Sequence, residues 1–285
     1  MGDIDIIMKG SIDMHLHHGP DPRVERRADA LQVARQAEEA GMRAIVLKSH
    51  EYPTAPVAYI INQIVSNISI FGSICLDHEV GGLNIHALEA SAKLGAKVVW
   101  MPTFTSANDR KLIGKSNDGI SILTSSGELL PVVDDILDII KSYQMVLATG
   151  HLSESEVFAL VERAVQKGVT SIVITHPLWP RGGARLGLNE QQRLANKGTF
   201  IEHCFGNTMP FPDRLDPMKI VEAVKYVGPE HCIITTDLGQ AHNPTPAEGM
   251  RMAIATLLKC GLSKEDLEMM VKTNPDKLLG LGFEN

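Results

Sequence analysis

Three histidines close the segment SIDMHLHH, residues 11–18, whose other residues have the apolar character of a β-strand. Residues two apart on a strand point to the same side, so His15 and His17 share one face while His18 lies on the other. Two imidazoles on one face supply half of the ligands of a metal site. A simple cluster of polar groups at a strand end fits the same residues, so the rest of the chain must decide.

Further metal-type side chains stand at the ends of other strand-like runs. ATGH ends in His151, VITH in His176 and ITTD in Asp237. Together with His15 and His17 they form a set of nitrogen and oxygen donors that suits zinc, manganese or iron. Water bound to such an ion becomes a nucleophile near neutral pH. A carboxylate such as Asp237 can touch the ion through one oxygen and accept the water proton through the other.

Eight short apolar, β-branched runs recur along the chain, and each is followed by a loop and an amphipathic stretch. This alternation favours parallel strands joined by crossover helices. The predicted strands are Ser11–His17, Ala44–His50, Ile70–Asp77, Ala96–Phe104, Met145–His151, Ser171–His176, Phe200–Cys204 and Cys232–Asp237. The predicted helices are Asp29–Ala40, Pro56–Ile68, Asn84–Leu94, Pro131–Tyr143, Ser153–Lys167, Asn189–Asn196, Asp216–Val227 and Thr245–Lys259.

Eight strand–helix units in 285 residues predict an α/β fold, a (β/α)8 TIM-type barrel whose active site forms at the carboxyl ends of the strands. A doubly wound open sheet also binds ligands there, but it rarely draws metal-type residues from nearly every strand. Without a Pro- or Gly-rich linker, residues 1–285 are expected to form one domain. The longest connection, 105–130, follows strand four and contains ISILTSSGELL, which resembles a hairpin. It is either a lid on the catalytic face or a surface decoration.

Composition limits the classes of partner. A formal net charge of −7 provides no positive field for nucleic acid or anionic lipid, so we expect neither. No apolar run is long enough to span a membrane, and acidic residues near the N-terminus do not fit a signal peptide. Four widely spaced cysteines without a CxxC pair suit reduced core thiols, which favours a cytoplasmic protein. They are Cys75, Cys204, Cys232 and Cys260.

In order along the chain, DMHLH, ATGH, VITH and ITTD resemble the metal-ligand motifs of the amidohydrolase superfamily, which are metal-dependent hydrolases. The tail TNPDKLLGLG is similar to an ending common in that superfamily, and the pattern extends from residue 13 to residue 282. GPD after the histidines, AGMRAIVLKSHEYPT and GGLN…LGAKVVWMPT resemble an uncharacterised family of predicted metal-dependent hydrolases within it. This narrower resemblance implies a class of enzyme and not a substrate.

The resemblance also implies roles for the donors. His15 and His17 would hold the more buried metal, with Asp237 alongside. His151 and His176 would hold a second metal, or orient the substrate if only one ion binds. The expected cofactor is one or two divalent ions, zinc first and manganese or iron as alternatives.

Strand four departs from the superfamily pattern. Many two-metal members carry there a lysine, carbamylated to bridge the ions, or a glutamate, whereas this run ends in VVWMPTF with Thr103 as its obvious oxygen donor. Lys48, at the end of strand two, is a candidate for the carbamate bridge, because a lysine among apolar neighbours loses its proton more readily. Alternatively, Lys48 pairs with a carboxylate or binds an anionic group of the substrate. Glu202 is the other candidate bridge.

Further polar residues are candidates for substrate contacts. His50, His203 and Glu202 stand at strand ends and are expected either beside the substrate or in supporting roles. Arg23 follows the first ligands, where a guanidinium can bind a carboxylate or phosphate through a bidentate fork. WPRGGARLG, after the predicted sixth strand, has two glycines and is a candidate for a mobile loop with Arg181 or Arg185 as a clamp.

The predicted activity is hydrolysis of an amide, cyclic amide or lactone, with Asp237 as general base and then acid and His176 among the catalytic groups. A non-oxidative decarboxylase with one metal, a phosphoesterase and a non-catalytic metal- or ligand-binding barrel are the alternatives. The chain lacks a Walker-type loop, GxGxxG and GxSxG, so nucleotide-dependent and serine-hydrolase activities have little support. We expect a small-molecule substrate, and a homo-oligomer is compatible with such a barrel.

Overall fold

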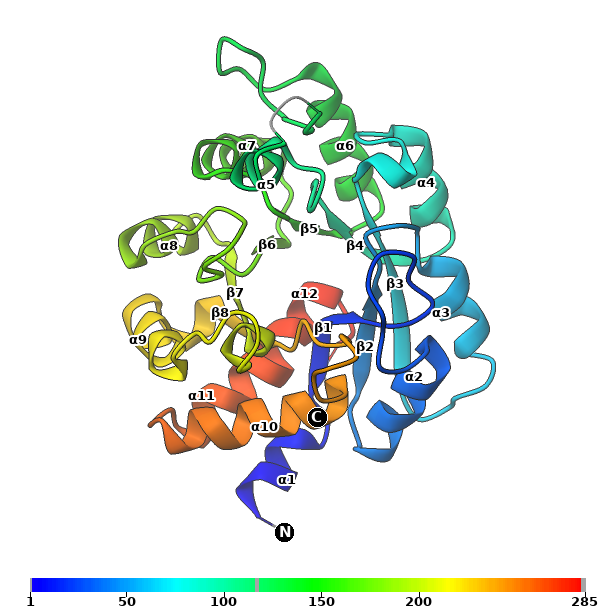
Figure 1. Ribbon diagram of the computed structural model, residues 1–285, viewed down its shortest axis with the longest axis vertical. Helices are drawn as coiled ribbons and strands as arrows, with labels where there is room; N and C mark the ends of the chain where they lie inside the picture. The colour runs from blue at the N-terminus through cyan, green and yellow to red at the C-terminus, as the bar shows by residue number, and fades with distance from the viewer. Residues whose placement is uncertain (1, 116–117, 283–285) are drawn as a thin grey trace.

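Eight parallel strands, paired in chain order, form the centre of the structure (Figure 1). The computed structural model describes residues 2–115 and 118–282. The strands are β1 (Ile12–His17), β2 (Ala44–Lys48), β3 (Ser69–Cys75), β4 (Ala96–Trp100), β5 (Val146–Ala148), β6 (Ile172–Ile174), β7 (Phe200–Cys204) and β8 (Cys232–Thr235). The predicted (β/α)8 barrel is confirmed. Most strands end earlier than predicted, because the polar residues at their carboxyl ends turn out of the ladder.

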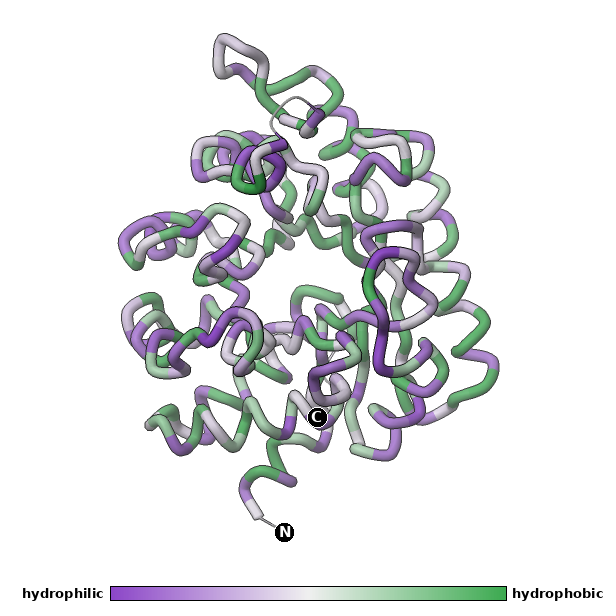
Figure 2. The backbone as a smooth tube through the Cα atoms, viewed as in Figure 1, coloured by the Kyte–Doolittle hydropathy of each residue, from purple (hydrophilic) through white to green (hydrophobic). Residues whose placement is uncertain are grey.

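Helices surround the strands and alternate with them along the chain (Figure 1). The predicted helices correspond to α2 (Ala30–Glu39), α3 (Ala55–Ile61), α4 (Ile85–Lys93), α6 (Pro131–Ser142), α7 (Glu154–Lys167), α8 (Leu188–Ala195), α9 (Pro217–Val227) and α10 (Pro246–Lys259). The helices α1 (Asp3–Met8), α5 (Ala107–Leu112), α11 (Lys264–Glu268) and α12 (Asn274–Leu279) were not predicted. Hydrophobic and hydrophilic residues alternate along the surrounding helices (Figure 2). Within the described ranges, no helix has the length and apolar character needed to cross a bilayer.

Two apolar clusters fill the fold. Inside the barrel, alternate residues of the strands pack around Trp100, and Leu278 and Leu279 of α12 close this cluster where the strands begin. The larger cluster lies between the strands and the helices. On β2 the inner positions are Ala44 and Val46, so the same alternation turns the next inner residue, Lys48, into the barrel mouth.

Strand β1 contains an irregularity that decides where its histidines point. Its pairing with β2 shifts register between Asp13 and Leu16, so β1 has one residue more than its neighbour in this stretch. Met14 packs inside the barrel, whereas Leu16 packs outside against the helices. The change of side after the shift directs His15 and His17 inward. The expectation that these two residues share a face is confirmed, and the bulge aims that face at the barrel axis.

The connection after β4 contains the short helix α5. Its final segment is the hairpin that the sequence suggested, with an antiparallel bridge between Leu123 and Leu129. Gly127 in the turn has φ +86°, a left-handed conformation that glycine adopts without strain. Residues 116 and 117 of the predicted loop lie outside the described residues. Asn108 of α5 donates hydrogen bonds to the carbonyls of His151 after β5 at 3.1 Å and Gly183 after β6 at 2.8 Å, so α5 lies beside the site described below.

Strands β1 and β8 meet at a seam where the barrel closes. The Asp237 N–H donates to the His15 carbonyl at 2.7 Å, and the His17 N–H donates to the Leu238 carbonyl at 2.8 Å. Beneath them lies the buried carboxylate of Asp13. It accepts hydrogen bonds from the Thr236 hydroxyl at 2.5 Å, the Thr236 N–H at 3.1 Å and the His15 N–H at 3.2 Å.

Removal of the Asp13 carboxylate should open this seam. We expect Asp13→Ala to lower the free energy of unfolding by about 3 kcal/mol, because buried donors lose their acceptor. Asp13→Asn keeps an oxygen for the two N–H groups and should cost clearly less. Urea unfolding followed by circular dichroism measures both variants. A loss below about 1 kcal/mol for Asp13→Ala would show that the seam does not depend on this residue.

Candidate metal centre

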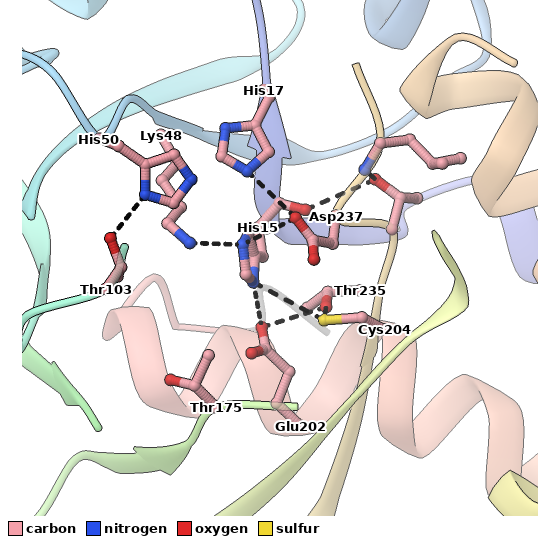
Figure 3. Close-up of polar contacts among 12 residues, drawn as sticks. His15, His17, Lys48, His50, Thr103, Thr175, Glu202, Cys204, Thr235 and Asp237 are labelled. Atoms are coloured by element: carbon pink, nitrogen blue, oxygen red, sulfur yellow. Dashed lines mark hydrogen bonds and ion pairs between the residues drawn. The ribbon is translucent and has the colours of Figure 1, made fainter. Parts of the chain in front are cut away.

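His15, His17 and Asp237 meet at the carboxyl ends of β1 and β8 (Figure 3). Asp237 Oδ1 lies 3.2 Å from His15 Nε2 and 3.0 Å from His17 Nε2. Both imidazoles are buried, whereas 22% of the Asp237 side chain is exposed toward the pocket. Two imidazole nitrogens and one carboxylate oxygen, all within 4.8 Å of one another, fit a zinc site with an open fourth position.

Glu202 fixes the orientation of His15 from below. Its Oε1 lies 3.1 Å from His15 Nδ1 and accepts a hydrogen bond from the Thr235 hydroxyl at 3.1 Å. The carboxylate has no proton to donate, so Nδ1 carries the proton and Nε2 faces Asp237. A carboxylate behind a ligand histidine is the usual arrangement in zinc sites. The structure thus places Glu202 beneath the imidazole and not in the pocket wall where a substrate contact was expected.

Charge is concentrated around these side chains. Burial and Lys48 oppose protonation of His15, but Asp237 and Glu202 outweigh them and raise the His15 pKa to about 9. Burial also disfavours ionised Asp237, yet the charge of His15 and the hydrogen bonds from His15 and His17 hold the Asp237 pKa well below the usual range. For His17, burial and nearby Arg26 keep the pKa well below the ordinary value. The His17 imidazole is therefore neutral, the form that binds metals.

Lys48 reaches the same nitrogen that faces Asp237. Its Nζ lies 2.8 Å from His15 Nε2 and 4.9 Å from the ring of Trp100, and the side chain is buried (Figure 3). The carboxylate oxygens of a carbamate at this position would lie beside the candidate metal ligands. An unmodified ammonium would instead compete with a metal for His15.

A cavity of about 230 Å³ opens above the triad. His151 and His176, from the ends of β5 and β6, line it beside His17, Lys48 and Asp237. Its other lining residues are Val24, Arg26, His50, Phe104, Trp179, Arg181, Gly206, Asn207, Phe211, Pro212, Asp213, Gln240, His242 and Asn243. In the part of the chain that the structure describes, His151 and His176 do not join a compact group of ligand atoms. The two histidines expected to hold a second ion thus line the same pocket as the first group of ligands, but their nitrogens are not gathered into a ligand group.

Asp109 of α5 orients His151. Its Oδ2 lies 2.5 Å from His151 Nδ1, and its Oδ1 accepts a hydrogen bond from the Gly183 N–H at 3.0 Å. Asp109 was not predicted, because nothing in the connection after β4 marks one acidic residue as facing a distant histidine. The buried Nδ1 of His176 has no hydrogen-bond partner among the described residues, and the residue has a φ of +26°. Burial and His151 lower the His176 pKa to about 3.

His50 lines the pocket next to His17, with the two rings stacked at 4.9 Å. Its Nδ1 lies 2.6 Å from the Thr103 hydroxyl, which is hydrogen-bonded to Asp77 (Figure 3). Burial and the charge of Lys48 lower the His50 pKa to about 3, so the ring is neutral. Thr103, expected as an oxygen donor of strand four, supports a histidine and does not line the pocket.

Two predicted substrate contacts lie elsewhere. Arg23 forms ion pairs with Glu51 at 2.5 Å and Glu79 at 2.7 Å and is outside the pocket wall, because these two carboxylates draw the guanidinium to the rim. His203 follows Glu202 on β7, and alternation turns it away from the barrel interior. It is buried with both ring nitrogens unpartnered among the described residues.

Arg26 and Arg181 stand where Arg23 was expected. Arg26 is held by Asp21, and its Nη2 lies 3.4 Å from His17 Nδ1. Arg181 is paired through Nε with Asp213, which also accepts from the Trp179 indole N–H at 3.1 Å. The loop after β6 therefore contributes Arg181, one of its two candidate arginines, to the pocket, whereas Arg185 is not among the lining residues. Asp213 ties Arg181 to the loop after β7.

The sequence profile of a family of unknown function, DUF6282, matches residues 10–202. The chain belongs to this family. The matched region begins just before β1 and ends at Glu202. Of the site residues predicted from the sequence, it therefore contains all except Asp237 and His203. A comparison with curated protein sequences gave no match.

Solved structures show the same fold at low identity. An amidohydrolase from Pseudomonas aeruginosa is 13% identical with a TM-score of 0.67, covering 98% of each chain. The probable dipeptidase PvdM from Pseudomonas aeruginosa is 13% identical with a TM-score of 0.70, covering 98% of this chain and 96% of that one. A 2,6-dihydroxybenzoate decarboxylase from Rhizobium is 12% identical with a TM-score of 0.56, covering 96% and 99%. These likenesses cover almost the whole chain and confirm the predicted barrel fold.

At Gly239, two residues after Asp237, the loop after β8 approaches the backbone of β1 closely. Its φ is +143°, and an added Cβ would lie 2.2 Å from the His17 carbonyl oxygen. We expect Gly239→Ala to displace the Asp237 segment and to cost about 2 kcal/mol more than Gly95→Ala. Gly95 is the matched control, with φ +89° and open space around it. Equal losses in chemical unfolding would mean that the close approach has no energetic weight.

Proposed function

We propose that the protein is a metal-dependent hydrolase that cleaves an amide, cyclic amide or lactone. The observation that carries the proposal is the meeting of His15, His17 and Asp237 at the base of the pocket, where His17 and Asp237 line the wall and His15 is buried beside them. Three protein ligands leave room for water or substrate, whereas structural zinc sites fill four positions and favour cysteine. Zinc is the proposed ion, with manganese or iron as alternatives.

When bound, the ion would supply an activated water and would polarise a carbonyl oxygen. Asp237, whose side chain is partly exposed to the pocket, would accept the proton of the attacking water and later pass it to the leaving group. His176 and His151 line the same cavity and would bind the substrate oxygen or orient the scissile bond. Arg26 and Arg181 would limit access from the rim.

The number of ions depends on Lys48 in this proposal. A carbamate on Nζ would bring carboxylate oxygens beside His15 and allow a bridge toward His151 and His176. One ion is favoured if Lys48 stays unmodified, because the second pair of histidines is not preassembled. Glu202 is less suited to bridge, since it lies behind His15 and already accepts two hydrogen bonds.

A mononuclear non-oxidative decarboxylase is the second candidate. It is favoured by the compact group of His15, His17 and Asp237 beside the pocket and by Lys48 as a positive charge for a substrate carboxylate. The shared fold with a protein described as a decarboxylase makes the reaction feasible on this barrel. In either case the proposed partner is a small molecule; a cytoplasmic location and a homo-oligomer stay predictions.

Metal content separates these proposals. We expect protein purified without chelator to contain about one or two zinc ions per chain by elemental analysis. His15→Ala should lose the ion, whereas His86→Ala, an exposed histidine on α4, should retain it. A fall from two ions to one in Lys48→Ala would support the carbamate bridge.

Turnover then separates the reactions. Libraries of amides, cyclic amides and lactones are assayed for acid release, and aromatic carboxylic acids for carbon dioxide. Activity lost in both His15→Ala and Asp237→Asn but kept in His86→Ala is expected. Wild-type protein that binds no zinc, manganese or iron after refilling would refute the proposed function.

Glu202→Gln tests the support behind His15. The amide can still contact Nδ1 but cannot stabilise charge on the imidazole, so we expect zinc affinity to fall about 10- to 100-fold. Competition with a fluorescent chelator measures this change. Glu128→Gln, in the hairpin far from β1, is the control, and equal affinity in both variants would remove the supporting role from Glu202.

A further inference from the structure

A chain of hydrogen bonds leads from the pocket wall into the protein, and its first member, His50, stacks on the candidate metal ligand His17. His50 Nδ1 lies 2.6 Å from Thr103 Oγ1, and the Thr103 hydroxyl is hydrogen-bonded to Asp77 Oδ2. Asp77 Oδ1 accepts from the N–H groups of Thr103 at 2.9 Å and Thr105 at 3.0 Å and from the Thr105 hydroxyl at 2.6 Å. The three linked side chains are buried.

The direction of this chain follows from its end. The Asp77 carboxylate can only accept, so the Thr103 hydroxyl donates its single proton to Asp77. The Thr103 oxygen must then accept, and the proton in the contact with His50 belongs to Nδ1. In a neutral imidazole with the proton on Nδ1, Nε2 carries a free lone pair.

The position of the ring is fixed as well. His50 lies between Phe104, with ring centroids 4.2 Å apart, and His17, with centroids 4.9 Å apart. Figure 3 shows the second nitrogen of His50 on the side toward His17, away from Thr103. This Nε2 has no hydrogen-bond partner among the described residues, and it is not fully buried. It therefore faces the pocket that His50 lines.

We propose that Asp77 and Thr103 are positioning residues that hold His50 as the Nδ1–H tautomer, and that its Nε2 is a hydrogen-bond acceptor for an N–H or O–H group of the substrate. The second part rests on the proposed function. It favours an amide or cyclic amide with a free N–H over a lactone, because a lactone ring offers this nitrogen no donor. A bound substrate that covers His50 Nε2 without donating a hydrogen bond to it loses binding free energy. A substrate without an N–H or O–H at this position is therefore disfavoured.

The tautomer is measured directly by nitrogen-15 NMR of histidine-labelled protein, which distinguishes a protonated ring nitrogen from a bare one. His50 should show protonated Nδ1 and bare Nε2 in the wild type and in Thr103→Ser, which keeps the hydroxyl. Thr103→Val removes the acceptor and should give mixed tautomers in a folded protein. A protonated Nε2 in the wild type, or an unchanged spectrum in Thr103→Val, would overturn the positioning role.

Succinimide and N-methylsuccinimide form a matched pair of probes that differ at the N–H. We expect succinimide to shift the His50 Nε2 signal at about tenfold lower concentration, the effect of one hydrogen bond. Equal shifts, or no shift with either compound, would refute the selection of N–H donors. A fixed tautomer in a chain that binds no metal would refute the proposed function alone, whereas metal binding with a mobile tautomer would refute this inference alone.

Discussion

The seam between β1 and β8 is the constraint on which the site depends. A parallel barrel closes only if its first and last strands meet, and here they meet through the backbone of the residues that carry the candidate ligands. His15 and His17 each share a backbone hydrogen bond with the segment after β8. The same closure that completes the fold therefore sets the distance between the imidazoles and Asp237. Glycine at position 239 is required because the two backbones come too close for a side chain.

Buried charge is the second constraint. Burying ionised groups costs free energy unless each finds a partner, and the floor of the barrel contains two carboxylates, a lysine and several imidazoles. Asp237 and Glu202 are compensated by His15 between them, and Lys48 contacts that same imidazole. A divalent ion at His15 Nε2 would bring two further positive charges to the nitrogen that Lys48 contacts. Metal binding thus requires that Lys48 move, lose its proton or become a carbamate, which links the state of one lysine to the number of ions.

Much of this arrangement was predictable from periodicity. The eight strands and their carboxyl-end polar residues follow from repeated β-branched runs and helix caps such as Asp216, whose carboxylate accepts from the Met218 N–H at 2.9 Å. Local pattern could not show the bulge in β1 or the outward direction of His203, since both depend on register with a neighbouring strand. The sequence could not show that Arg23 lies at the rim for a similar reason, because its ion-pair partners Glu51 and Glu79 come from other loops.

The residues behind the histidines were the hardest to foresee, yet they follow one rule. Each of three imidazoles in or beside the pocket wall gives its Nδ1 to an acceptor from another element: His15 to Glu202, His50 to Thr103, and His151 to Asp109. This leaves their Nε2 atoms for other contacts: the Nε2 of His15 faces Lys48 and Asp237, and His50 and His151 line the pocket. His176 differs, because its buried Nδ1 has no partner among the described residues. Its proton is fixed by no neighbour, so His176 is the imidazole of this group that can change between donor and acceptor without breaking a hydrogen bond.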